Sequence, residues 1–235
     1  MKKTIILLSL CVLFLGCTRE YGGVPTTKNY SINGSYTGLD VSNAFQVTVS
    51  DEVTDVVVTV GEMAHDRVIV KVTDGELHIG FKPNTRYNGK ATAVIPANAN
   101  LRDLDLSGAS TFVGDLSGHD VDIDLSGAST FRGNVDADEI DIDLSGASNA
   151  FINGRCQNKM EIDLSGASTL KAANLNAQSV SGHMSGASFA DVTVCSSLNV
   201  ELSGASTLTY GTISDDCHPN VNCPSSGSST VRPRR

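Results

Sequence analysis

Residues 121–131 read Val-Asp-Ile-Asp-Leu-Ser-Gly-Ala-Ser-Thr-Phe, and close variants of this stretch recur along the second half of the chain. The tetrapeptide Ser-Gly-Ala-Ser begins at Ser107, Ser126, Ser145, Ser165, Ser185 and Ser203, in steps of 19, 19, 20, 20 and 18 residues. Repetition at a nearly fixed short period is typical of a solenoid, in which each repeat is one coil stacked on the previous one. The repeat predicts architecture, whereas function depends on the surface that the solenoid displays.

The residues before each motif alternate between apolar and charged side chains, as in Val121-Asp122-Ile123-Asp124-Leu125. A period of two predicts a strand with one buried face. Strands of equal register in successive coils should stack in parallel, about 4.8 Å apart. We therefore predict an all-β fold, a parallel β-solenoid of 19–20 residues per coil with a core of Leu, Ile and Phe.

If this alternation continues through the motif, its second serine points inward. We expect the buried hydroxyls of this column to hydrogen-bond one another and the nearby backbone. The column consists of Ser110, Ser129, Ser148, Ser168, Ser188 and Ser206.

The chain begins with Met1-Lys2-Lys3 and a short apolar run, which is typical of a secretory signal peptide over residues 1–16. Phe14-Leu15-Gly16-Cys17 resembles the bacterial lipobox. This resemblance implies that Cys17 becomes the lipid-modified first residue of the mature protein; the alternative is an ordinary signal peptide cut elsewhere. Residues 17–29 are polar and contain Gly and Pro, so we interpret them as a flexible tether.

Residues 30–100 lack the motif but contain alternating stretches such as Phe45–Val49 and Val56–Val60. A solenoid needs its open ends covered, so we expect this β region to be continuous with the solenoid as a cap or as irregular first coils. Residues 101–235 form the repeat solenoid with a C-terminal cap, in which Ser226–Val231 is a degenerate last coil.

The chain is acidic, with a formal net charge of −9. Loss of residues 1–16 removes Lys2 and Lys3 and no acid, which gives −9 − 2 = −11. An acidic chain without a basic patch argues against nucleic acid as a partner.

The lipobox-like signal, the Val-rich stretch from Phe45 to Phe81 and the repeated Leu-Ser-Gly-Ala-Ser together resemble the putative auto-transporter adhesin, head GIN domain family. The resemblance covers roughly Asp40 to Val231. It implies a right-handed β-solenoid from a Bacteroidetes-type bacterium, with lipid anchoring at the outer membrane on either its outer or its periplasmic side. The family supplies no catalytic residues to carry over.

Two columns of carboxylates should stack on the outer face of the strands before the motif. Like charges about 5 Å apart repel by roughly 1 kcal/mol per pair in water, and a bridging Ca²⁺ would relieve this. A solvated acidic face that aids solubility is the favoured interpretation; the alternative is a cation or ligand face. The columns are Asp103, Asp122, Asp141 and Glu161, and then Asp105, Asp124, Asp143 and Asp163.

The sequence offers little for catalysis, because no base accompanies each repeated serine. His183 replaces Asp in the second column, where it could serve as an acid, a base or a metal ligand. The leading hypothesis is a non-enzymatic envelope lipoprotein without a cofactor that binds a glycan or protein through its long faces. The alternatives are a structural envelope protein without a ligand and a polysaccharide-active enzyme.

Four cysteines remain after Cys11 and Cys17. Cys156 and Cys195 occupy nearly equivalent positions two coils apart, beyond the reach of a disulfide. Cys217 and Cys223 flank a short Pro-containing insertion, so we predict a bridge between them, with Cys195–Cys217 as the alternative.

Overall fold

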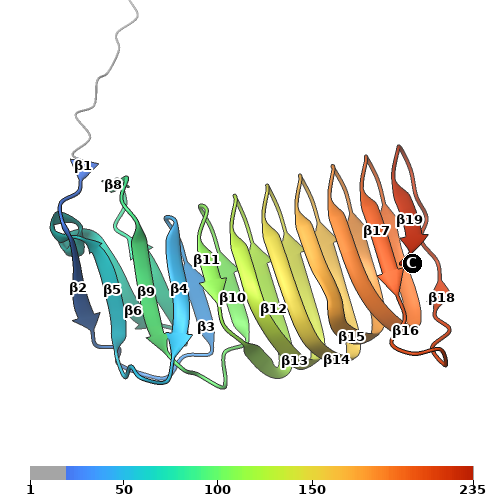
Figure 1. Cartoon of the computed structure of the whole chain (residues 1–235), viewed down its shortest axis with the longest axis horizontal. Helices are drawn as coiled ribbons and strands as arrows, with labels where there is room; N and C mark the ends of the chain where they lie inside the picture. The colour runs from blue at the N-terminus through green and yellow to red at the C-terminus, as the bar shows by residue number, and fades with distance from the viewer. Residues whose placement is uncertain (1–19, 235) are drawn as a thin grey trace, which may run out of the picture.

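The computed structural model describes residues 20–234, which form a β-solenoid of about seven turns. No helix in the described range is long and apolar enough to cross a membrane. The 3-10 helix η1 (Glu62–Arg67) lies between two strands, and the strands are β1 (Glu20–Tyr21), β2 (Pro25–Tyr30), β3 (Gly38–Val41), β4 (Phe45–Ser50), β5 (Val56–Gly61), β6 (Val68–Thr73), β7 (Glu76–Phe81), β8 (Arg86–Tyr87), β9 (Ala91–Pro96), β10 (Asp103–Leu106), β11 (Thr111–Val113), β12 (Leu116–Leu125), β13 (Thr130–Leu144), β14 (Asn149–Leu164), β15 (Thr169–Met184), β16 (Phe189–Leu202), β17 (Thr207–Gly211), β18 (Asn220–Val221) and β19 (Thr230–Pro233). From β10 onward the coils follow one another in chain order along the long axis, as the change of colour from green to red shows, whereas the N-terminal strands lie in the order β2, β5, β9 and β4 (Figure 1).

Parallel pairing of the repeat strands confirms the predicted solenoid. Ile123 lies beside Ile142 and Leu125 beside Leu144, one coil apart in the sequence. The same register continues from β13 to β14 and from β14 to β15, with a few local irregularities. Leu144 is 1% exposed, whereas its neighbour Asp143 is exposed, so the assignment of inner and outer columns is also confirmed.

The motif glycine makes a tight turn that packs against the same turn in the preceding coil. Gly146 has φ +70°, and a Cβ built on it would lie 2.4 Å from the carbonyl oxygen of Gly127 in the preceding coil. Ala147 then donates its N–H to that same carbonyl at 2.7 Å. Glycine therefore allows a left-handed turn and a close contact between coils at the same point.

The second motif serine is buried, as predicted; its members are 0–2% exposed. These hydroxyls do not bond one another, however. Ser129 Oγ donates to the carbonyl of Ser126 at 2.8 Å, and Ser148 Oγ does the same to Ser145. Ser110 and Ser206 close their turns in the same way, whereas Ser168 Oγ and Ser188 Oγ are buried without a hydrogen-bond partner among the described residues.

The N-terminal strands continue the interior of the repeats. Parallel β3 joins the first repeat coil through Leu39 beside Leu104, and β7 lies on its other side. Beyond this point the pairing becomes antiparallel: β6 pairs with β7, β5 with β9, and β2 with β5. The N-terminal end thus consists of irregular parallel coils covered by antiparallel strands.

The predicted Cys217–Cys223 bridge is wrong, and the alternative pairing is present. Cys195 is bonded to Cys217, with 4.7 Å between their Cα atoms. Cys223 is free and packs against the core, where its Sγ lies 3.9 Å from the carbonyl of Leu198. Cys223 thus fills an inward position of the last coil, while the loop before β18 brings Cys217 back to β16. Cys156 is free and buried, as expected for a residue two coils from Cys195.

Candidate binding groove

A groove of about 400 Å³ runs along the solenoid beside the motif turns. One wall consists of outward carboxylates from the strands before the motif, and the other of the first motif serines. Because both sets repeat once per coil, the groove presents a row of carboxylates and a row of hydroxyls, both parallel to the solenoid axis. Its polar lining residues are Asp105, Asp124, Asp143, Asp163, His183, Ser126, Ser145, Ser165 and Ser185.

The carboxylates of the groove form one continuous column. Asp105 lies beside Asp124, Asp124 beside Asp143, and Asp143 beside Asp163. The column extends toward the N-terminus through Asp40, which pairs in register with Asp105. We call this column the acidic ladder.

The sequence prediction missed the N-terminal part of the acidic ladder. Leu39-Asp40-Val41-Ser42-Asn43-Ala44 has the pattern of a strand and motif, with Asn43 in place of the motif glycine. Asn43 has φ 62°, a left-handed conformation that Asn adopts more readily than most residues. This degenerate motif is the signal that could have revealed Asp40.

Burial in the groove raises the pKa values of Asp105, Asp124 and Asp143 above the ordinary aspartate range. Repulsion from neighbouring carboxylates of the ladder is the second cause for each of these three.

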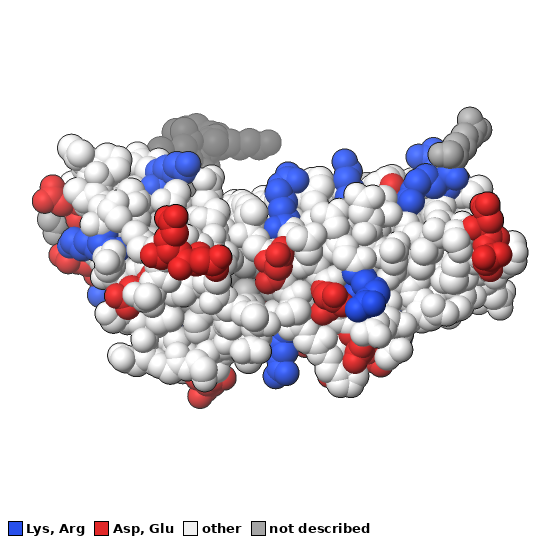
Figure 2. Space-filling model, turned by 60° about the horizontal axis from the view of Figure 1, so that its bottom comes forward, with Lys and Arg blue, Asp and Glu red and all other residues white. Residues whose placement is uncertain are grey.

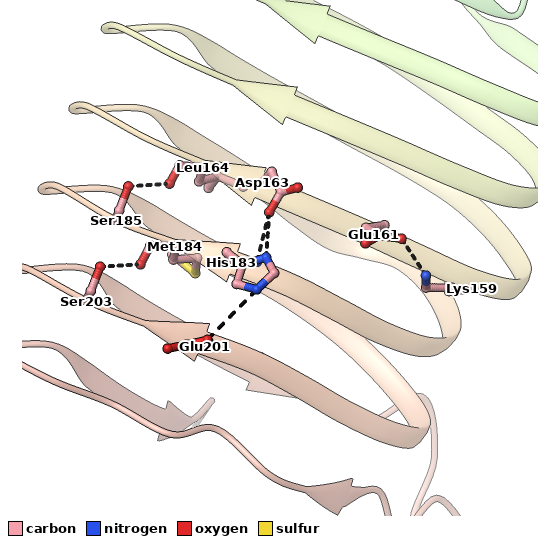
Figure 3. A network of polar contacts seen from close by, with 9 residues as sticks. All are labelled: Lys159, Glu161, Asp163, Leu164, His183, Met184, Ser185, Glu201 and Ser203. Carbon is pink, nitrogen blue, oxygen red and sulfur yellow. Dashed lines mark hydrogen bonds and ion pairs between the residues drawn. The ribbon is translucent and has the colours of Figure 1, made fainter.

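A histidine lies next to the ladder at each end. His78 Nδ1 is 2.9 Å from Asp40 Oδ2. His183 Nδ1 is 3.1 Å from Asp163 Oδ1, and its Nε2 lies 3.9 Å from Glu201 Oε2 (Figure 3). His183 thus lies between carboxylates of the coils before and after its own, and it is well exposed to solvent.

The other predicted column, Asp103, Asp122, Asp141 and Glu161, also stacks in register but lies outside the groove. Burial is the main cause that raises the pKa values of Asp122 and Asp141. Lys159 forms an ion pair with Glu161 at the end of this column (Figure 3).

Neither column forms a metal centre of recognisable geometry. Over residues 20–234 no group of three or more His, Cys, Asp or Glu side chains is placed to hold a metal ion. Cys17, the predicted lipidation site, lies outside the described residues. On the face seen in Figure 2, acidic and basic side chains are scattered over a mainly uncharged surface.

Comparison with known proteins agrees with the repeat architecture. The family model described as "Putative auto-transporter adhesin, head GIN domain" matches residues 35–212. The chain belongs to this family. The predicted family is thereby confirmed, and family and fold point to a non-enzymatic, adhesin-like protein.

Solved structures share the fold at low sequence identity. A "putative adhesin" from Bacteroides fragilis has a TM-score of 0.78 at 16% identity, over 92% of this chain and 100% of that one. A "putative adhesin" from Parabacteroides distasonis has a TM-score of 0.65 at 22% identity, with coverages of 92% and 99%. A "putative lipid binding protein" from the same organism has a TM-score of 0.65 at 17% identity, with the same coverages. No curated protein matches the chain.

Proposed function

We propose that the protein is a non-enzymatic, adhesin-like binding solenoid that holds a hydroxyl-rich glycan along the groove beside the acidic ladder. The groove is the observation that carries this proposal. Its carboxylates accept hydrogen bonds from sugar hydroxyls, and its serines both donate and accept them. Because the same groups recur at each coil, an extended polymer would meet the same contacts at each step.

A glycan array tests this proposal with the purified full-length protein in detergent. The variant pair D124N/D143N removes two carboxylates from the groove and should abolish binding of the captured glycan. D122N/D141N is the matched control, because it removes the same charge from the same strands outside the groove, and it should bind normally. Equal loss in both variants would reject the groove as the site.

A polysaccharide-active enzyme is the second candidate. Asp124 and Asp143 lie side by side on adjacent coils, and burial raises the pKa values of both carboxyls, as a general acid of a carboxylate pair requires. The release of reducing ends from glycans captured on the array decides between the two functions. We expect none; release that stops in D143N would replace the binding function by hydrolysis.

We also propose that Cys17 carries the lipid that anchors the protein to the outer membrane. The basic start, the apolar run and the lipobox-like end support this. The tether is shorter than the predicted residues 17–29, because β2 (Pro25–Tyr30) pairs antiparallel with β5 and so belongs to the fold. Metabolic labelling with a clickable fatty acid should mark the native protein and not C17S. Protease treatment of intact cells would show whether the solenoid faces the medium or the periplasm. If no ligand binds the protein at either side of the outer membrane, the alternative of a structural envelope protein without a ligand would be favoured.

A further inference from the structure

The strands that follow the motif carry a row of side chains that the acidic ladder does not use. On their outer face Val113, Arg132, Phe151 and Lys171 lie in register on successive coils. The Arg132 guanidinium carbon is 3.7 Å from the centre of the Phe151 ring, and Lys171 Nζ is 5.5 Å from it. One aromatic ring thus lies between two cations, and we call this the cation row.

These two cations are exceptions among the basic residues of the repeat coils. Between residues 101 and 221 the chain has five Lys and Arg residues. Arg102, Arg155 and Lys159 each form an ion pair with a carboxylate. The side chains of the other two, Arg132 and Lys171, have neither an ion-pair partner nor a hydrogen bond among residues 20–234.

The acidic residues nearest to the cation row already have hydrogen-bond or ion-pair partners, or they lie at one end of the row. Asp191 is the residue next to Lys171 on the following coil, and Arg234 binds it at 2.6 Å. Asp115 accepts two hydrogen bonds from Asn134 at 2.9 Å. Asp51 and Asp115 line a hollow of about 600 Å³ that Arg132 also borders. An anion would therefore be favoured over Phe151 and toward Lys171 rather than in that hollow.

Phe151 prepares the two cations for binding. A ring under a guanidinium or ammonium group holds it through the cation–π attraction while leaving its N–H donors free. Less side-chain freedom is then lost when a ligand binds. In a chain of net charge −9, two fixed cations with unused donors are typical of a site for an anionic group.

We infer that the cation row binds a carboxylated polysaccharide lying along the solenoid axis. Arg132 and Lys171 are two coils apart, about 10 Å, so they would bind carboxylates spaced along one chain. Beside them runs a second outward column with hydroxyl and amide groups that match sugar hydroxyls: Thr111, Thr130, Asn149 and Thr169. A peptide would gain less here, since these strands are paired on both sides and offer no free edge for strand addition.

Titration calorimetry on the full-length protein in detergent tests this inference with oligogalacturonate as the probe. The fully methyl-esterified oligomer has the same backbone without the charges and serves as the control ligand. We expect binding of the acid form and at least about tenfold weaker binding of the ester. R132Q and K171Q should each weaken binding of the acid form about tenfold.

Two further variants separate the site from bulk charge and from folding. R155Q removes one positive charge from an ion-paired, exposed arginine and should change affinity less than about twofold. F151L should weaken binding about threefold, and F151Y should restore it because the ring returns. No binding of oligogalacturonate, equal binding of the ester, or an equal loss in R155Q would overturn the inference. Loss in D124N/D143N but not in R132Q would also overturn it, by placing the ligand in the groove.

Discussion

The repeat coils and the N-terminal coils build the same interior from different chain connections. In the repeats, one stretch of 19–20 residues makes each coil, and every coil pairs in parallel with the next. In the N-terminal region, β3 and β7 occupy adjacent positions of the same stack, yet β6 lies between them in the sequence and pairs antiparallel with β7. The stack therefore depends on the register of inward side chains and not on a fixed connection between coils.

The comparison also shows where each region obtains its stability. Leu144 in the repeats and Val41 in β3 both belong to the last inward column before the turn, and they are 1% and 0% exposed. The turn that follows differs, because the repeats use Gly at positive φ, whereas β3 is followed by Asn43 and Ala44 at φ 62° and 61°. The core column is common to both regions, and the stacked glycine turn belongs to the repeats.

The largest expected effect tests whether the two regions form one cooperative unit. L144D should lower the free energy of unfolding by about 5 kcal/mol, because it places an unpaired charge in the core. V41D should cost a similar amount, since Val41 pairs with Leu106 in the same column. Guanidinium unfolding measures both. If V41D melts the N-terminal strands and leaves the repeats at their native midpoint, the regions are separate domains.

The second effect distinguishes the two kinds of turn. G146A should cost about 4 kcal/mol, because a left-handed alanine is strained and its Cβ would lie 2.4 Å from the carbonyl oxygen of Gly127. G75A should cost only about 1 kcal/mol. Gly75 also has positive φ, but no atom lies within 4 Å of its Cβ position. If chemical denaturation gives the same loss of unfolding free energy for both variants, the contact between coils adds nothing to the cost of placing alanine at positive φ.

Sequence patterns predicted the repeat coils well and the positions between them poorly. Alternation from Val121 to Leu125 gave strand, inner face and register, because burial on a pleated strand has a strict period of two. For the N-terminal region the sequence did not decide between a cap and irregular coils, because Asn43 stands where the motif has glycine and the motif is therefore not recognised. The acidic columns were found, but the groove depends on how the turns project beside them.

Other features arise from contacts between residues that no local pattern links. Cys217 reaches Cys195 because the loop before β18 folds back on β16, whereas spacing alone favoured Cys223. The cation row combines Arg132, Phe151 and Lys171 from three coils. The sequence would have revealed the cation row only if the outward positions after the motif had been aligned across all coils.

The third prediction concerns the C-terminal end, which lacks the antiparallel cover of the N-terminal end. Loss of the Cys195–Cys217 bridge in C195S/C217S should cost about 3 kcal/mol, as expected for a loop closed across 22 residues. The loss should fall on the last coils, because each coil contacts only its neighbours. Hydrogen exchange should therefore speed up in β17–β19 and not in β12–β13. Peptide mapping without reduction should find Cys223 alkylated; a Cys217–Cys223 peptide would contradict the pairing.

The smallest effect compares the ladder within the two regions. D143N removes the repulsion of Asp143 from Asp124 and Asp163, so it should raise the free energy of unfolding at pH 7 by less than about 1 kcal/mol. D40N should lower it by a similar amount, because Asp40 bonds His78 at 2.9 Å. Thermal unfolding of both variants measures the difference, and equal signs would reject the contrast.

The pH dependence gives an independent check on the same residues. Burial, followed by like charges, raises the folded-state pKa values of Asp124 and Asp143 above their unfolded values. The folded protein then binds more protons than the unfolded chain over the range just above the ordinary aspartate pKa of about 3.9. Stability contributed by these groups should therefore rise as pH falls through that range. D124N/D143N should lose this rise in stability, whereas D40N should keep it. If the stability of the two variants changes with pH in the same way, water screens the stacked charges fully.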